Sequence, residues 1–166
     1  MSKTDDKARI VIAVTELTPV RQLWREALQR LRESQAELFA LFVADDRWRR
    51  AASLPFTREI SRLSGMDADF TLRRASQVHE EAINRTRYRM QKLASEANLA
   101  LMFEVLPESD QQRIRELVAG SQNILIAPSF ITGRPLFAEL QKLDCRIVLI
   151  EAEEEPDESK GVTRQP

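Results

Sequence analysis

Residues 123–135 read Asn-Ile-Leu-Ile-Ala-Pro-Ser-Phe-Ile-Thr-Gly-Arg-Pro. The apolar run at the start predicts a strand that ends at Ala127-Pro128. A loop with two hydroxyl groups, one glycine and one arginine follows, and Pro135 then opens a helix. A loop between the carboxyl end of a strand and the amino end of a helix is where α/β sheets bind ligands. The stretch therefore predicts an α/β fold with a candidate binding loop.

Length and composition describe one ordinary globular domain. The 166 residues are 43% hydrophobic and 31% charged. No apolar run approaches the ~20 residues that a membrane span needs, and the amino terminus lacks the apolar segment of a signal peptide. The single cysteine, Cys145, excludes an internal disulfide and is typical of a reducing compartment. We therefore expect a cytoplasmic protein without membrane insertion.

The amino-terminal part of the chain predicts a strand–helix–strand unit. Residues 9–15 (Arg-Ile-Val-Ile-Ala-Val-Thr) and 37–43 (Glu-Leu-Phe-Ala-Leu-Phe-Val) are apolar runs typical of strands buried on both faces. Between them, apolar residues recur at helical spacing, with Thr18 as the predicted N-cap and Pro19 as the first helical residue. This order of elements predicts a right-handed parallel crossover.

The rest of the chain continues the alternation after an irregular helical insertion at about residues 47–66, which we expect to lie over the carboxyl edge of the sheet. Its apolar residues, such as Trp48 and Phe56, predict either a filling for an empty cleft or a partner surface.

The alternation predicts a parallel sheet with helices on both faces, in one domain over residues 9–151. The later predicted elements are a helix at 68–97 stopped by Asn98, a strand at 99–105, a helix after a capping box at Ser109 and Gln112 that Gly120 terminates, a strand at 123–127, a helix at 135–143 and a strand at 146–150. The predicted inner face of the long helix consists of Phe70, Ala75, Val78, Ala82, Thr86, Met90, Leu93 and Ala97.

Both ends of the chain predict disorder. Residues 1–8 carry no apolar periodicity, and residues 151–166 hold six acids against Lys160 and Arg164. We interpret residues 152–166 as a solvated acidic tail, with partner docking as the alternative role.

The common nucleotide motifs are absent. The chain has neither the Gly-Lys-Ser/Thr phosphate loop nor Gly-x-Gly-x-x-Gly after the first strand, and it holds only four glycines. A backbone that closes around phosphates normally needs glycines. The only histidine, His79, excludes a metal site built on two histidines.

Four stretches together resemble the universal stress protein family. They are the strand at residues 9–14, the strand at 38–43, the helix end and strand at 93–105, and the closing Asp-Cys-Arg-Ile-Val-Leu-Ile at 144–150. The resemblance implies a Rossmann-like sheet of five parallel strands in the order 3-2-1-4-5. It also implies a homodimer that forms through the last strand, whose candidate interface residues are Arg146, Ile147, Val148, Leu149 and Ile150.

The chain departs from the ATP-binding pattern of that family. Members that bind ATP carry an aspartate where this chain has Thr15, and Gly-x-x-Gly followed by Gly-Ser/Thr where this chain has the single Gly133. Val43 matches the position that lines the adenine pocket. The resemblance therefore implies a branch that has lost the triphosphate cradle.

The loop after the fourth strand still offers groups for an anion. Its hydroxyls, its guanidinium and the amides at the start of the next helix suit a negative charge. The alternative, which we favour, is that Ser129 or Thr132 caps the helix and Arg134 is solvated. The candidate ligand-binding residues are Thr15, Val43, Ser129, Thr132, Gly133 and Arg134.

Two further polar groups favour structural interpretations. Asp45 and Asp46 suit a metal ion or acid–base chemistry, but no third acid or histidine lies near them in sequence, so we expect a turn. Ten arginines between residues 47 and 92 suggest nucleic-acid binding, but acids interrupt them. A solvated or protein-docking helix face is therefore the preferred interpretation.

These observations predict a non-catalytic regulatory protein of the universal stress type, acting as a homodimer on an unknown protein partner without a cofactor. No nucleophile–base pair and no metal cluster can be assembled from the sequence, so we expect no enzyme, with a weak ATPase left open. The alternative is a sensor of AMP, ATP or another small anion, with its cleft at the ends of the first and fourth strands.

Overall fold

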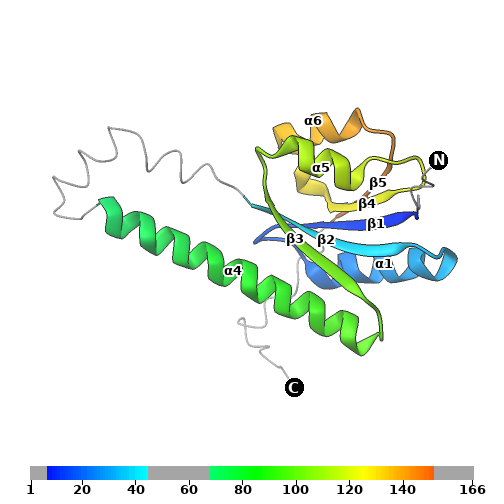
Figure 1. Cartoon of the computed structure of the whole chain (residues 1–166), viewed down its shortest axis with the longest axis horizontal. Helices are drawn as coiled ribbons and strands as arrows, with labels where there is room; N and C mark the ends of the chain where they lie inside the picture. The colour runs from blue at the N-terminus through cyan, green and yellow to red at the C-terminus, as the bar shows by residue number, and fades with distance from the viewer. Residues whose placement is uncertain (1–6, 45–67, 152–166) are drawn as a thin grey trace, which may run out of the picture.

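The computed structural model describes residues 7–44 and 68–151 and shows a three-layer α/β domain (Figure 1). The predicted insertion at 47–66, the acidic tail at 152–166, and Asp45 and Asp46 lie outside the described residues. The strands are β1 (Arg9–Val14), β2 (Glu37–Ala44), β3 (Leu101–Pro107), β4 (Ile124–Pro128) and β5 (Arg146–Ile150). The helices are α1 (Val20–Glu33), α4 (Ala68–Glu96), α5 (Gln111–Val118), the 3₁₀ helix η1 (Ser129–Gly133) and α6 (Pro135–Gln141).

The five strands form one sheet in the order β3-β2-β1-β4-β5, and every pair of neighbours is parallel. Both the predicted fold class and the strand order are confirmed. Ile10 in the central strand pairs with Leu38 on one side and with Ile124 on the other. All the carboxyl ends of the strands therefore meet at one edge of the sheet, to which the predicted binding loop belongs.

Helices cover both faces of the sheet, as predicted. Ile10, Ile12 and Val14 of β1 pack in one apolar cluster with residues of α1 and α4, whereas Val11 and Ala13 pack in a second cluster with residues of α5 and α6. Figure 1 shows α1 and α4 below the sheet and α5 and α6 above it. Since alternate side chains of a strand point to opposite faces, a strand covered on both sides must be apolar throughout. This explains the unbroken apolar runs in the sequence.

Helix α1 begins one residue later than predicted. Val20, Leu23, Trp24 and Ala27 form its buried stripe, at the spacing that brings side chains to one helix face. Pro19 occupies the N-cap position, and no side chain caps the helix. The prediction of Thr18 as the N-cap is wrong, because the Thr18 hydroxyl instead accepts a hydrogen bond from the Thr15 amide.

Helix α4 has 29 residues and extends well beyond the sheet at its amino-terminal end (Figure 1). Its carboxyl-terminal part enters the core, where Met90 and Ala94 are almost fully buried. The predicted inner-face position Val78 is 58% exposed, so that assignment is wrong. The helix ends at Glu96, one residue before the predicted end, and Asn98, the predicted stop, follows with a φ of 59° in the left-handed region that terminates helices.

Side chains of α4 also reach the edge strand β3. The Arg87 guanidinium lies 5.1 Å from the ring centroid of Phe103, and the Gln91 side chain donates a 3.3 Å hydrogen bond to the Leu101 carbonyl. Strand β3 runs two residues later in the sequence than predicted, and includes Pro107. The predicted capping box of α5 is wrong, since Asp110 is the N-cap and accepts from the Arg113 amide.

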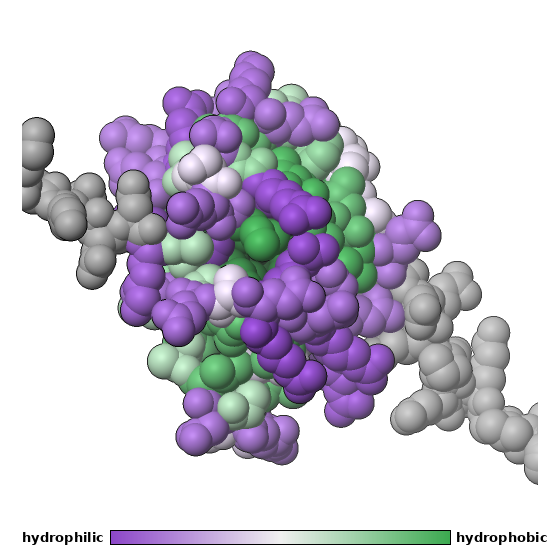
Figure 2. All heavy atoms as spheres, turned by 90° about the vertical axis from the view of Figure 1, so that its right-hand side faces the viewer, coloured by the Kyte–Doolittle hydropathy of each residue, from purple (hydrophilic) through white to green (hydrophobic). Residues whose placement is uncertain are grey.

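The amino-terminal edge of the sheet is organised by Asn123, which is 7% exposed. Its Oδ1 accepts from the Arg9 amide at 2.9 Å, and its Nδ2 donates to the carbonyls of Val118 and Ala119 at 3.2 and 3.0 Å. One side chain thus joins the start of β1 to the end of α5. Figure 2 views the molecule from the right-hand side of Figure 1, where β1 begins, and hydrophilic residues cover most of this face, with apolar residues between them.

Candidate functional site

The candidate ligand-binding residues lie on the elements that meet at the carboxyl edge of the sheet. Thr15 directly follows β1, Val43 is the last residue but one of β2, and the segment from Ser129 to Arg134 follows β4. Because β2, β1 and β4 are neighbouring parallel strands, their ends are adjacent. What each side chain offers a ligand depends on the contacts it already makes.

Thr15 is buried and its polar groups are satisfied locally. Its Oγ1 lies 3.0 Å from the Thr18 Oγ1 and accepts from the Leu17 amide at 3.3 Å. Its amide donates to the Thr18 Oγ1 at 2.7 Å, and the Thr18 amide donates back to the Thr15 carbonyl. Two neutral hydroxyls thus close the β1–α1 turn without a charged group. Thr15 is 6% exposed in the described structure. Unlike an aspartate at this position, it has no carboxylate with which to bind a ligand or a metal ion.

Val43 belongs to the core. It is 2% exposed and packs in the cluster that contains Leu106, Ile131 and Leu136. These neighbours come from β3, η1 and α6, so residues on both sides of the β2 end close over it. Among the described residues, Val43 presents no open apolar surface to a planar ring.

The segment from Ser129 to Gly133, expected as a loop, forms the 3₁₀ helix η1. Thr132 donates from its hydroxyl to the Ser129 carbonyl at 2.9 Å, and Ile131 points into the core with 1% exposure. Neither Ser129 nor Thr132 caps α6, so that interpretation is wrong; Arg134 is the N-cap residue and no side chain caps the helix. The space around the Gly133 Cα is open. The buried Ile131 side chain thus holds this segment against the core. The sequence had suggested a binding loop here because of its two hydroxyl groups.

Arg134 lies across the carboxyl edge and is not solvated as expected. Its Nη1 is 3.8 Å from Oε2 of Glu108, and the two side chains are 21% and 17% exposed. Glu108 follows β3, and its amide donates to the Ala44 carbonyl at the end of β2. The pair thus connects the segment after β4 to the segment after β3, although β1 and β2 separate those strands in the sheet. The Arg134 Nη1 is buried and has no hydrogen-bond partner among the described residues.

Glu108 was not predicted as a site residue. In the sequence it stands alone between Pro107 and Ser109, and only the strand order brings it toward Arg134. An acid directly after a predicted strand was the one available signal, because the ends of all strands in a parallel sheet share an edge.

A second polar contact ties the β1–α1 turn to the long helix. The Nδ1 of His79 lies 2.8 Å from Oε1 of Glu16, and the His79 ring packs edge-on against Phe42 with 6.3 Å between centroids. His79 therefore packs between the sheet and the turn. Among residues 7–44 and 68–151, no three histidine, cysteine or acidic side chains form a group that could hold a metal ion.

The last strand is the edge strand that the resemblance assigned to dimer contacts. No described residue pairs with the outer side of β5, whose only strand neighbour is β4. Arg146 and Leu149 are exposed, the latter by 39%, while Ile147, Val148 and Ile150 are partly buried. No helix in the described part of the chain is long and apolar enough to cross a membrane.

A solved structure shares this fold. It is the crystal structure of a protein from the universal stress protein family from Burkholderia pseudomallei, with a TM-score of 0.52 and 13% sequence identity, over 89% of this chain and 98% of that chain. No family model and no curated protein matches the chain. The chain has the fold of a universal stress protein. At 13% identity the similarity extends to the fold and not to the site.

Proposed function

We propose that the chain is a non-catalytic regulatory protein of the universal stress type, which acts as a homodimer through contacts with other proteins and binds ATP weakly or not at all. The fold supports the type, since the similarity to the Burkholderia protein covers nearly the whole of both chains.

The main support for the proposal is that the candidate ligand-binding side chains at the carboxyl edge of the sheet are already buried or paired with other residues. The Thr15 hydroxyl is used by the β1–α1 turn, Val43 is buried, and Arg134 is paired with Glu108. A triphosphate needs several free donors and usually a metal ion held by carboxylates. In the described part of the chain the edge supplies one guanidinium, which already faces a carboxylate. This arrangement supports an architectural role for the edge.

Titration calorimetry with ATP, ADP and AMP, each with and without Mg²⁺, tests the nucleotide part of the proposal. We expect no saturable heat in the micromolar range that Arg134→Ala removes. Saturable micromolar binding of any of the three nucleotides, lost in Arg134→Ala, would contradict it.

The dimer is proposed to form by antiparallel pairing of β5 with β5 of a second copy. An apolar edge strand with unpaired backbone groups favours such pairing, and a two-fold axis closes it. The Arg146 amide donates to the Asn123 carbonyl of the preceding segment, so this amide points toward β4. Since amide directions alternate along a strand, the Leu149 amide points outward.

Replacement of that outward amide gives a specific test. Leu149→Pro removes a donor of the free edge and spares the ladder with β4, whereas Leu149→Ala keeps the donor and serves as the control. Light scattering of the native chain should give about twice the 19.1 kDa monomer mass at micromolar concentration. We expect the proline variant to be a folded monomer and the alanine variant a dimer. A monomeric native chain would refute the dimer.

One observation favours the alternative function, an adenine-nucleotide or small-anion sensor at the ends of β1 and β4. The buried Arg134 Nη1 lacks a hydrogen bond to the described residues and sits 3.8 Å from Glu108, too far for one. A buried, unsatisfied cationic donor costs free energy, and an anion that displaced Glu108 would recover it. The calorimetry above separates the two functions, because only the sensor predicts saturable binding that depends on Arg134.

A further inference from the structure

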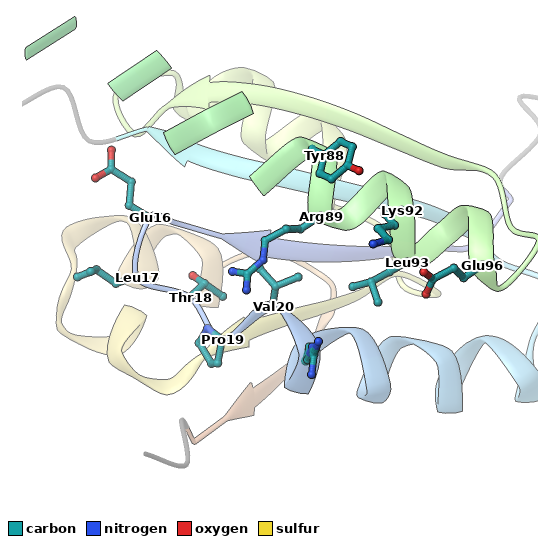
Figure 3. Close-up of a pocket in the computed structure, with 11 residues that line it drawn as sticks. Glu16, Leu17, Thr18, Pro19, Val20, Tyr88, Arg89, Lys92, Leu93 and Glu96 are labelled. Carbon is teal, nitrogen blue, oxygen red and sulfur yellow. The ribbon is translucent and has the colours of Figure 1, made fainter. Parts of the chain in front are cut away.

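A cavity of about 510 Å³ lies between the start of α1 and the carboxyl-terminal half of α4 (Figure 3). It opens on the α1/α4 side of the sheet, while the Arg134–Glu108 pair connects segments that lead into α5 and α6. Its volume is in the range of small-molecule sites, ~300–1,000 Å³. The cavity borders the β1–α1 turn, whose Glu16, Leu17 and Thr18 help to line it, but none of the six candidate ligand-binding residues does. A ligand here therefore goes beyond the proposed function.

Three cationic side chains line this cavity. Arg21 comes from the first turn of α1, and Arg89 and Lys92 come from α4. Figure 3 shows Arg89 and Lys92 projecting from α4 toward the start of α1. None of the three makes an ion pair or a side-chain hydrogen bond with another described residue. Other basic side chains in the described ranges, such as Arg30 and Arg113, do have acidic partners.

The acids at the cavity offset this charge only in part. Glu16 lies at one end and is engaged by His79 at 2.8 Å. Glu96 lies at the opposite end in Figure 3, one helical turn beyond Lys92. Between them, the middle of the cavity is lined by the cations. The N-terminus of α1 adds to the positive potential, because the helix starts here with no side-chain cap and no acid in its first turn.

Apart from Thr18, the remaining lining residues are apolar or aromatic. Tyr88 is 68% exposed at the rim, and Pro19 and Leu93 contribute apolar surface. An exposed aromatic ring beside unpaired cations suits a ligand with an aromatic or apolar body and acidic groups. An inorganic ion would contact the cationic groups but would leave the apolar and aromatic surface exposed to water.

We propose that the α1/α4 cavity binds a small organic anion that carries at least two negative charges on an aromatic or apolar body. The cations of both helices would hold the acidic groups, and Tyr88 with Leu93 would contact the body. Sulfonates, phosphate esters and polycarboxylates share this chemistry, and the proposal concerns the class they form.

The test measures fluorescence anisotropy of pyranine, a trisulfonated pyrene dye, titrated with the full chain at about 100 mM salt, where the Debye length is about 10 Å. We expect saturable binding with one site per chain. Arg89→Gln with Lys92→Gln should weaken it by about a hundredfold, since each charge-assisted contact contributes roughly tenfold. Tyr88→Ala should weaken it by roughly threefold to tenfold.

The matched control removes two exposed charges from the same helix outside the cavity, by Arg73→Gln with Arg74→Gln. Both lie about four helical turns before Arg89, roughly 22 Å along the axis. The affinity of this variant should stay within about twofold of the native chain, because exposed charges more than a Debye length away are screened. Equal weakening in both double variants would show general attraction to a basic helix and overturn the proposal. Absence of saturable binding to the native chain, with circular dichroism showing it folded, would overturn it as well.

Competition resolves the nature of the ligand. Naphthyl phosphate should displace pyranine at lower concentration than inorganic pyrophosphate, which has the charge without the aromatic body. If pyrophosphate competes equally well, the cavity recognises charge alone and the aromatic part of the proposal is wrong.

Discussion

Asn123→Ala should destabilise the protein more than any other exchange of a polar residue at the amino-terminal edge of the sheet. The side chain makes three hydrogen bonds, one from the Arg9 amide and two to the carbonyls of Val118 and Ala119. Alanine can replace none of them, and the site is 7% exposed, so water has little access. The substitution therefore leaves one backbone donor and two acceptors without partners.

The expected loss follows from those groups. A buried polar group that loses its partner costs about 1–3 kcal/mol, and two of the three sites are only partly buried, which gives about 3 kcal/mol in total. With a urea m-value of about 2 kcal/mol/M, the unfolding midpoint should fall by about 1.5 M.

Urea unfolding followed by circular dichroism at the helix signal measures this shift. Asn84→Ala is the matched control, because Asn84 is exposed on α4 and accepts one 3.2 Å hydrogen bond from Arg87. Its midpoint should change by less than the equivalent of about 0.5 kcal/mol. The view that this side chain joins α5 to β1 would be refuted if the urea midpoint of Asn123→Ala fell by less than about 0.5 M, or if the midpoints of both variants shifted equally.

Three further predictions concern single sites. Gly120→Ala should cost about 1–3 kcal/mol by urea unfolding, since φ is +155° and a Cβ would lie 2.6 Å from the Asn123 Nδ2; an unchanged midpoint would contradict this. Met90→Ala should cost about 2–5 kcal/mol in the same assay, because the side chain is fully buried between α4 and the sheet; a loss under 1 kcal/mol, well below that range, would show that the core collapses around the gap. Burial, with a smaller effect of the Asp144 carboxylate, raises the pKa of the Cys145 thiol, so its reaction with a disulfide reagent at neutral pH should be slower than that of glutathione and should accelerate in urea. A faster reaction in the folded state would contradict that last prediction.

Much of the fold could be predicted from the sequence because its signals are local. The apolar runs at Arg9–Val14 and Glu37–Ala44 are unbroken since both faces of each strand are covered. Helix ends were harder, because several capping residues compete within a few positions. Ser109 and Asp110 are adjacent, and the structure uses Asp110; Thr18 has the right residue type, yet its hydroxyl serves the Thr15 turn.

The candidate site could be located but not characterised. Sequence order places Thr15, Val43 and the segment after β4 at one edge of a parallel sheet, and this much the structure shows. Whether those side chains are free depends on contacts between distant segments. The Arg134–Glu108 pair and the burial of Val43 in one cluster with Ile131 arise from the strand order, so no local sequence pattern predicts them. The α1/α4 cavity has the same origin, since helix packing is what brings Arg21 and Arg89 to the lining of one cavity.

The two edges of the sheet differ in one respect that limits how copies of this chain can associate. At β3 the α4 side chains Arg87 and Gln91 contact the strand, while at β5 no described strand pairs with the outer side. Pairing of β5 with β5 would use the unpaired edge of each copy. Each end of the joined sheet would then be a β3 strand that α4 side chains contact. The proposed pairing would therefore stop at two copies, and the same asymmetry would keep a dimer of this kind from growing into a fibre.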